Sequence, residues 1–106
     1  MCHCGAIRII VRRTPRSVTS CNCSVCRRYA ALWAYYQPSS VRIEAPKNGL
    51  SGYSWNRRIR TYYRCKACGC ITHYAHTDER PGGAVAVNAR MFDKFDGADT
   101  WKYVPS

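Results

Sequence analysis

Hydrophobic and polar residues alternate along several short stretches of the chain, and this two-residue period is typical of β-strands. At the start, Ile7, Ile9 and Val11 alternate with arginines, and this stretch ends at Thr14-Pro15. Further apolar or alternating stretches lie at residues 31–36, 41–44, 50–55, 59–64, 71–76 and 84–89. No stretch has the 3.6-residue period of a long helix. The sequence therefore predicts a mainly β fold.

Local signals refine this prediction at two points. The stretches at 50–55 and 59–64 flank Asn56-Arg57-Arg58 and are predicted to form a hairpin. Ser24 is a candidate cap for one helical turn through Arg28, because its hydroxyl can accept hydrogen bonds from free amides.

The chain has 106 residues without an evident repeat or linker, so we predict one domain spanning residues 1–106. Domains of this size have a limited core, and bound metal ions often compensate.

The chain is strongly basic, with 17 lysines and arginines against 6 acidic residues and a formal charge of +11. Thirteen of the cations are arginines, whose planar fork suits carboxylates and phosphates. The charge therefore predicts an anionic partner, either a nucleic acid or a small acid such as a peptide with free carboxylates. No apolar run approaches the roughly 18 residues of a membrane span, so we expect no membrane segment.

Eight cysteines fall into three clusters: Cys2-His3-Cys4-Gly5, Cys21-Asn22-Cys23-Ser24-Val25-Cys26 and Cys65-Lys66-Ala67-Cys68-Gly69-Cys70. Disulfides are one interpretation of so many cysteines in a small chain. However, Cys-x-Cys neighbours seldom reach disulfide geometry without strain, and the N-terminus has no apolar signal-peptide core. We therefore predict a reduced, cytoplasmic protein that binds zinc through these thiols.

The first and third clusters are predicted to share one zinc ion. Cys65-x-x-Cys68 followed by Gly69 has the spacing of a zinc knuckle and needs two further ligands. Cys2 and Cys4 are the natural donors, because they form a second close pair of thiolates followed by a glycine. Four thiolates complete a tetrahedral shell, so this site should be structural.

The middle cluster supplies three sulfurs from six residues, Cys21, Cys23 and Cys26. Three protein ligands with an open fourth position are typical of catalytic zinc. Two alternatives are a closed site completed by Cys70, His73 or His76, and a redox pair within the cluster. Cys70 can also be an ordinary buried thiol. His73 and His76 lie three residues apart on a predicted strand and should point to opposite faces.

Five motifs in order resemble the glutathione-dependent formaldehyde-activating enzyme family, which includes the centromere protein V group. Besides the three cysteine clusters, they are Tyr53-Ser54-Trp55-Asn56 and Val87-Asn88-Ala89-Arg90. The resemblance implies an Mss4-like β-tent of small antiparallel sheets cross-linked by zinc. It also implies a structural zinc on Cys2, Cys4, Cys65 and Cys68, and a catalytic zinc on Cys21, Cys23 and Cys26.

The family resemblance further implies a reaction, the addition of glutathione to formaldehyde, which gives S-hydroxymethylglutathione and is classed as a carbon–sulfur lyase activity. On this hypothesis a tyrosine hydroxyl or water protonates the new alkoxide, and arginines such as Arg57 or Arg58 hold the carboxylates of the tripeptide. The alternative is a basic zinc-binding module for nucleic acid or a protein partner, without catalysis. Against a nucleic-acid role, the basic residues are spread along the chain and no DNA-reading helix is evident.

Overall fold

The computed structural model describes residues 1–56, 58–77, 83–92 and 101–104. Within them the chain is mainly β, as predicted. The strands are β1 (Arg8–Val11), β2 (Val18–Cys21), β3 (Trp33–Tyr36), β4 (Val41–Glu44), β5 (Leu50–Tyr53), β6 (Arg60–Cys65), β7 (Ile71–His76), β8 (Val85–Asn88) and β9 (Trp101–Val104). The helical elements are each one turn long: α1 (Cys26–Tyr29), η1 (Pro38–Ser40) and η2 (Ala89–Met91). No helix in the described part of the chain is long and apolar enough to cross a membrane.

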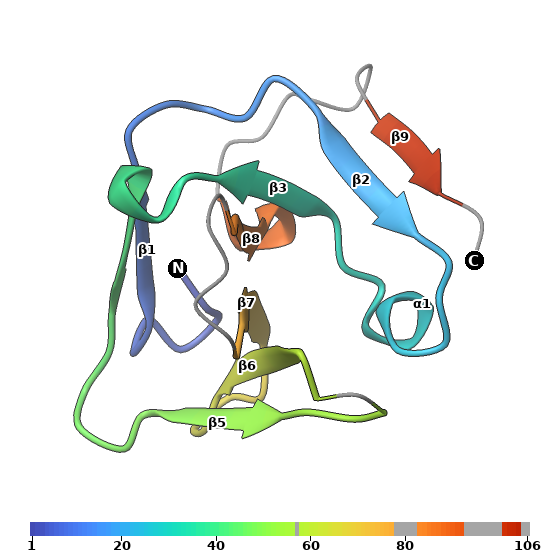
Figure 1. Cartoon of the computed structure of the whole chain (residues 1–106). Coiled ribbons are helices and arrows are strands. Elements are labelled where there is room, and N and C mark those ends of the chain that lie inside the picture. Colours follow the sequence, from blue (N-terminus) through green and yellow to red (C-terminus); the bar gives the residue numbers. More distant parts are fainter. Residues whose placement is uncertain (57, 78–82, 93–100, 105–106) are drawn as a thin grey trace.

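The strands form two sheets (Figure 1). One pairs β1 with β4, and the other has the order β5-β6-β7-β8-β3-β2-β9. All neighbours are antiparallel except β2 and β9, which run parallel. The predicted hairpin is confirmed, because β5 pairs with β6 from Leu50↔Cys65 to Tyr53↔Tyr62. The sequence pattern did not predict β2 or β9.

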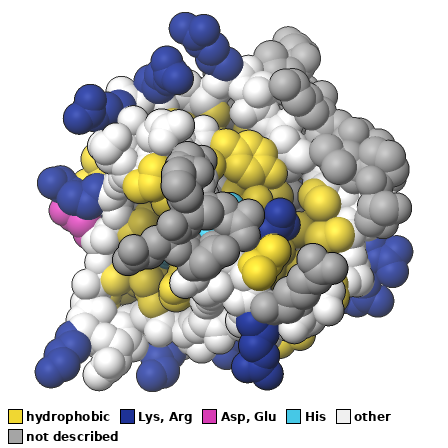
Figure 2. All heavy atoms as spheres, in the orientation of Figure 1, with side chains coloured by type: hydrophobic (Ala, Val, Ile, Leu, Met, Phe, Trp, Pro, Cys, Tyr) yellow, Lys and Arg dark blue, Asp and Glu magenta, His cyan; other side chains and the backbone are white. Residues whose placement is uncertain are grey.

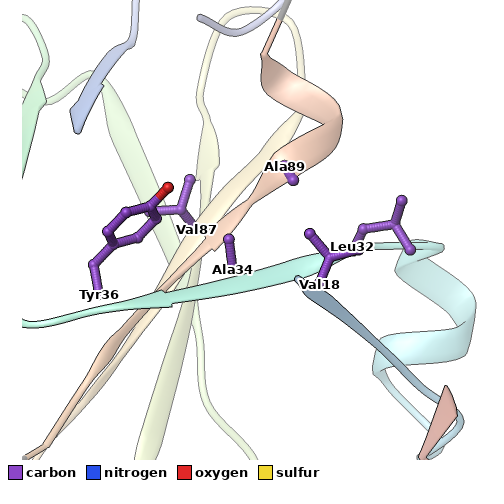
Figure 3. Close-up of a cluster of buried hydrophobic side chains, with 6 residues drawn as sticks. All are labelled: Val18, Leu32, Ala34, Tyr36, Val87 and Ala89. Carbon is purple, nitrogen blue, oxygen red and sulfur yellow. The ribbon is translucent and has the colours of Figure 1, made fainter. Parts of the chain in front are cut away.

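Strand β3 lies in the core and has buried residues on both faces, although Tyr35 is half exposed. Leu32, Ala34 and Tyr36 lie on one side, in a cluster with Val18, Val87 and Ala89 (Figure 3). Trp33 is fully buried on the other side, in a cluster with Cys26, Tyr62 and Tyr74. Burial on both faces explains why residues 31–36 form a continuous apolar and aromatic run without alternation.

The short helix α1 forms at the predicted place, but the prediction that Ser24 caps it is wrong. The N-cap residue is Val25, whose backbone is already right-handed helical, and no side chain caps the helix. The Ser24 carbonyl instead accepts a hydrogen bond from Nη1 of Arg28 at 2.7 Å. The helix ends at Ala30, which has a left-handed backbone with φ 54°. An alanine pays a steric cost in this conformation, so the surrounding contacts must hold it there.

His73 on β7 is a buried histidine of the core. Its side chain is 7% exposed and stacks on Tyr63, with ring centroids 4.8 Å apart. The Thr72 hydroxyl donates to the Tyr63 carbonyl at 3.3 Å and lies 2.9 Å from Nδ1 of His73. Because that hydroxyl has one proton, it accepts from an Nδ1–H of a neutral ring. Burial lowers the pKa of His73 to about 4.

This buried ring predicts a pH dependence of stability. The folded pKa lies below the ordinary value of 6.5, so the unfolded chain binds the proton more readily and acid favours unfolding. Between pH 7 and pH 5 the unfolding free energy of the parent should fall on the order of 2 kcal/mol more than that of a His73→Gln variant, which lacks the titrating ring. Urea unfolding of both proteins at each pH measures this difference, and loss of metal in acid affects both alike. A difference that does not change with pH would contradict a neutral buried ring.

Candidate metal centres

Four thiols from the two ends of the cysteine pattern meet in one group. The sulfurs of Cys2, Cys4, Cys65 and Cys68 all lie within 4.8 Å of one another. Cys4 Sγ is 3.7 Å from Cys2 Sγ and 3.6 Å from Cys65 Sγ. These distances exceed an S–S bond and match the roughly 3.8 Å between sulfurs around a tetrahedral ion with 2.3 Å bonds. The group therefore has the shape of a four-thiolate metal site, as the spacing predicted.

Two similar turns present these thiols. Gly5 and Gly69 each follow the second cysteine of a pair, and both have φ 82°, a left-handed value that favours glycine. The Gly5 amide donates to the Cys2 carbonyl at 3.1 Å, and the Gly69 amide donates to the Cys65 carbonyl at 2.8 Å. An added Cβ at Gly69 would meet nothing within 4 Å, so the requirement for glycine there is one of backbone conformation.

Backbone amides also point at the sulfurs of this group. The Ile7 amide donates to Cys2 Sγ at 3.3 Å, and the Cys68 amide donates to Cys65 Sγ at 3.5 Å. Amides of Cys70 and Cys4 lower the pKa of the Cys68 thiol to about 5. Such donors stabilise thiolates, the form that binds metal. Cys2 and Cys65 are buried with Ile7, so the group links the N-terminal segment to the turn after β6.

The middle cluster forms a second group of three thiols. Cys21 ends β2, Cys23 lies in the following turn and Cys26 begins α1, and their sulfurs lie within 4.8 Å of one another. The Cys26 amide donates to Cys23 Sγ at 3.4 Å. Burial, with the neighbouring Cys23 thiol, raises the pKa of Cys26 to about 12. Three such thiols ionise together only with a nearby cation, so the donor set fits a metal ion.

No other cysteine, histidine or acidic side chain among the described residues joins either group. Cys70, His73 and His76 therefore do not complete the middle site in the described structure. Cys70 is half-buried and packs against the cluster around Cys2, while its carbonyl accepts a hydrogen bond from the Cys65 amide at 2.9 Å. An ion on Cys21, Cys23 and Cys26 would have three protein ligands and an open position.

Aromatic side chains enclose the middle site from the sheet side. The indole Nε1–H of Trp33 donates to Cys26 Sγ at 3.3 Å, a contact that sequence reasoning missed. Trp33 also packs edge-on to Tyr74, with ring centroids 4.8 Å apart, and Tyr62 lies 5.2 Å from Tyr74. In the sequence, the only indication of this contact was that Trp33 lies in an apolar run. This hydrogen bond lowers the pKa of Cys26 and so acts against the larger effect of burial.

A cavity of about 220 Å³ borders this aromatic cluster through Tyr62. Its other lining residues are Trp55, Asn56, Ile59 and Arg60. The Arg60 guanidinium lies 5.3 Å from the centre of the Tyr74 ring, a cation–π contact. On the face seen in Figure 2, hydrophobic side chains collect toward the middle and Lys and Arg side chains lie around the rim.

The structure describes one of the two arginines that were suggested to hold the substrate carboxylates. Arg57 lies outside the described residues, and Arg58 is exposed at the hairpin tip, where its carbonyl accepts from Thr77 Oγ1 at 2.6 Å. Arg58 is not among the residues that line the cavity, whereas Arg60 is.

Hydrogen bonds of Asn88 and Arg90 support the segment next to the thiol group of Cys21, Cys23 and Cys26. Oδ1 of Asn88 accepts hydrogen bonds from the Leu32 and Arg90 amides at 3.3 and 3.2 Å, and its Nδ2 donates to the Ile71 carbonyl at 2.9 Å. Nε of Arg90 donates to the Ala30 carbonyl at 2.6 Å. Ala30 is the strained residue that ends α1, so this motif helps to hold the helix that carries Cys26.

Taken together, the fold and the thiol groups are those of a small cysteine-rich β protein with two potential metal centres. The family model of the glutathione-dependent formaldehyde-activating enzyme matches residues 1–104, and the chain belongs to this family. The chain is also similar to a Rhodobacter sphaeroides protein of known crystal structure, with 26% identity and a TM-score of 0.80. That likeness covers 100% of this chain and 97% of the other. Comparison with curated proteins gave no match.

The two thiol groups predict that the chain binds two metal ions and that a single cysteine substitution in either group removes one of them. We expect the reduced, metal-loaded chain to bind two divalent ions, and Cys23→Ser and Cys65→Ser to bind one each. Cys65→Ser should also unfold at lower denaturant concentration, because it opens the link between the N-terminus and β6. Elemental analysis gives the stoichiometry, and the absorption of cobalt-loaded protein reports the thiolate ligands.

Cys70→Ser is the matched control for these variants, because it removes a nearby thiol that belongs to neither group. It should keep both ions. This assignment of ligands would be contradicted if Cys70→Ser lost an ion. It would also be contradicted if Cys65→Ser still bound two ions.

Proposed function

We propose that the protein is a zinc-dependent enzyme that adds a thiol, glutathione, to formaldehyde and gives S-hydroxymethylglutathione. The observation that carries the proposal is the group of Cys21, Cys23 and Cys26, which has three thiols and no fourth described ligand. Membership of the formaldehyde-activating family supports this reaction class. In the same proposal, Cys2, Cys4, Cys65 and Cys68 hold a structural zinc.

Zinc is the ion that both donor sets favour, because all their ligands are thiolates and their spacing is tetrahedral. When bound to the middle group, zinc would supply an open coordination position and lower the pKa of an incoming thiol. Thiolate ligands persist in a reducing compartment, so we also propose that the protein works in the cytoplasm.

The chain's own residues have distinct roles in this scheme. Cys21, Cys23 and Cys26 hold the metal, and the Trp33 indole keeps the Cys26 sulfur oriented through its hydrogen bond. The substrate sulfur forms a bond to the aldehyde carbon, and the electron pair of the C=O π bond moves to oxygen. That oxygen then takes up one proton, which balances the proton lost by the thiol. Tyr62 packs in the cluster that contains Cys26 and also lines the cavity, so we assign its hydroxyl as the proton donor.

Arg60 is the residue that we propose to bind a carboxylate of glutathione. It lines the cavity, and the Tyr74 ring and the Tyr62 hydroxyl both contact its guanidinium. A guanidinium held by two neighbours loses less freedom when it binds a carboxylate than one that is free in solvent. Arg60 thereby takes the role that the sequence suggested for Arg57 or Arg58.

The test is the rate of exchange between formaldehyde and glutathione, followed by NMR on reduced, zinc-loaded protein. The intact protein should accelerate the exchange, and Cys23→Ala should reduce it to the rate of a protein-free sample, because the variant lacks the middle metal site. Cys70→Ala is the matched control and should keep the acceleration. The protein-free sample is essential, because thiols add to formaldehyde spontaneously.

Circular dichroism and metal content establish that Cys23→Ala is folded and retains one ion. Equal rates in all samples would rule out glutathione–formaldehyde catalysis by this chain. Acceleration that persists in a folded Cys23→Ala protein would place the chemistry outside the middle group.

A further inference from the structure

The connection between β1 and β2 carries a second group of hollows, lined by basic residues. A hollow of about 440 Å³ is lined there by Arg12, Arg13, Tyr35 and Ser40, among others. A second hollow of about 200 Å³ shares Arg13 and Tyr35 with it and adds Arg16. A third, of about 440 Å³, shares Arg12 and Ser40. Because each of the other two hollows shares residues with the first, the three lie next to one another along this connection, and we call their shared surface the basic groove (Arg12, Arg13, Arg16, Tyr35 and Ser40).

The backbone of the basic groove is fixed while its cations stay exposed. The Arg12 amide donates to the Ser40 carbonyl at 3.1 Å, and the Tyr36 hydroxyl donates to the Arg13 carbonyl at 3.0 Å. Figure 1 shows this connection passing from β1 over the top of the molecule to β2. All three arginine side chains are exposed. The backbone that carries these arginines is therefore held in place, and their exposed guanidinium groups are accessible to an anion.

The charge of the groove is not neutralised within the described chain. Glu44 pairs with Arg8 and Arg42, at 3.6 and 3.3 Å, but none of the groove arginines forms an ion pair with a described carboxylate. No acidic residue is among those that line the three hollows. Three arginines within five residues, without an ion pair to a described carboxylate, favour a ligand with several anionic groups, and their forks suit phosphates.

Tyr35 adds an aromatic surface between these cations. Its side chain is 50% exposed although it stands on the central strand β3, and it contacts Tyr74 edge-on with centroids 6.5 Å apart. An exposed ring beside arginines is the combination by which proteins bind unpaired bases and their phosphates. The described helices have at most four residues, so the surface offers no helix to the major groove of a duplex.

We propose that the basic groove binds single-stranded nucleic acid, with Arg12, Arg13 and Arg16 on the phosphates and Tyr35 stacked on a base. The groove contains none of the thiols and shares no lining residue with the cavity at Arg60, so the proposal does not depend on the proposed reaction. The length of the groove, which extends across three hollows, suits a polymer better than one small anion.

The test is fluorescence anisotropy of a labelled single-stranded oligonucleotide of about twelve nucleotides, titrated with the zinc-loaded full chain. The log of affinity should fall linearly with the log of salt concentration between about 50 and 200 mM. The triple variant Arg12→Gln, Arg13→Gln, Arg16→Gln should reduce the magnitude of that slope by about 2, since each single-strand phosphate contact contributes roughly 0.7. Tyr35→Ala should weaken binding about tenfold with the slope unchanged, and Tyr35→Phe should bind as the parent does.

The matched control carries the same charge change away from the groove, as Arg8→Gln, Lys47→Gln, Arg64→Gln. It should keep most of the affinity and slope of the parent. An equal loss in both triple variants would show that binding is a general effect of net charge, and would overturn the proposal. Equal affinity for a duplex of the same sequence, or for an acidic peptide of equal charge, would also overturn it.

Discussion

Sulfur atoms that carry like charges at close range are the constraint on which the rest of this structure depends. Cys4 and Cys65 are 61 positions apart in the chain, yet their sulfurs lie 3.6 Å from each other. An ion shared by the four thiolates would close that long loop and remove much of the freedom of the unfolded chain. Without a cation, the same arrangement gathers thiols that oppose one another's ionisation. The N-terminal segment and the turn after β6 are thus joined by the four-thiol group as well as by the apolar cluster around Ile7.

The two thiol groups differ in the number of their donors and in the number of chain segments that supply them. The group of Cys2, Cys4, Cys65 and Cys68 has four donors from two distant segments. The group of Cys21, Cys23 and Cys26 has three donors from one segment, supported by the Trp33 indole and by the Asn88 and Arg90 hydrogen bonds. A closed shell suits stability, whereas an open shell beside an aromatic cavity suits exchange of ligands. Cys21 ends β2 and Cys65 ends β6, so both groups are attached to the same sheet.

Sequence reasoning was sufficient where the information is local. Alternation identified the strands around Ile9, Ile43 and Tyr62, and cysteine spacing anticipated both thiol groups, because neighbouring ligands and a following glycine form one turn. It failed where partners are distant. Residues 18–21 contain one strong apolar residue, so β2 is evident only from its pairing with β3 and β9. The contact of Trp33 with Cys26 and the position of Arg60 depend on strand register across the sheet, which no local pattern records.

The two thiol groups also differ in when they can form during protein synthesis. Cys21, Cys23 and Cys26 span six residues, so they can capture an ion as soon as that segment has left the ribosome. Cys2 and Cys4 must wait until Cys65 and Cys68 have been made, which takes seconds at ordinary elongation rates. A metal ion could therefore bind the three-thiol group before the four-thiol group is complete. While the nascent chain is incomplete, Cys2 and Cys4 are a free dithiol, and this interval is when they are most open to oxidation or to capture of a wrong metal.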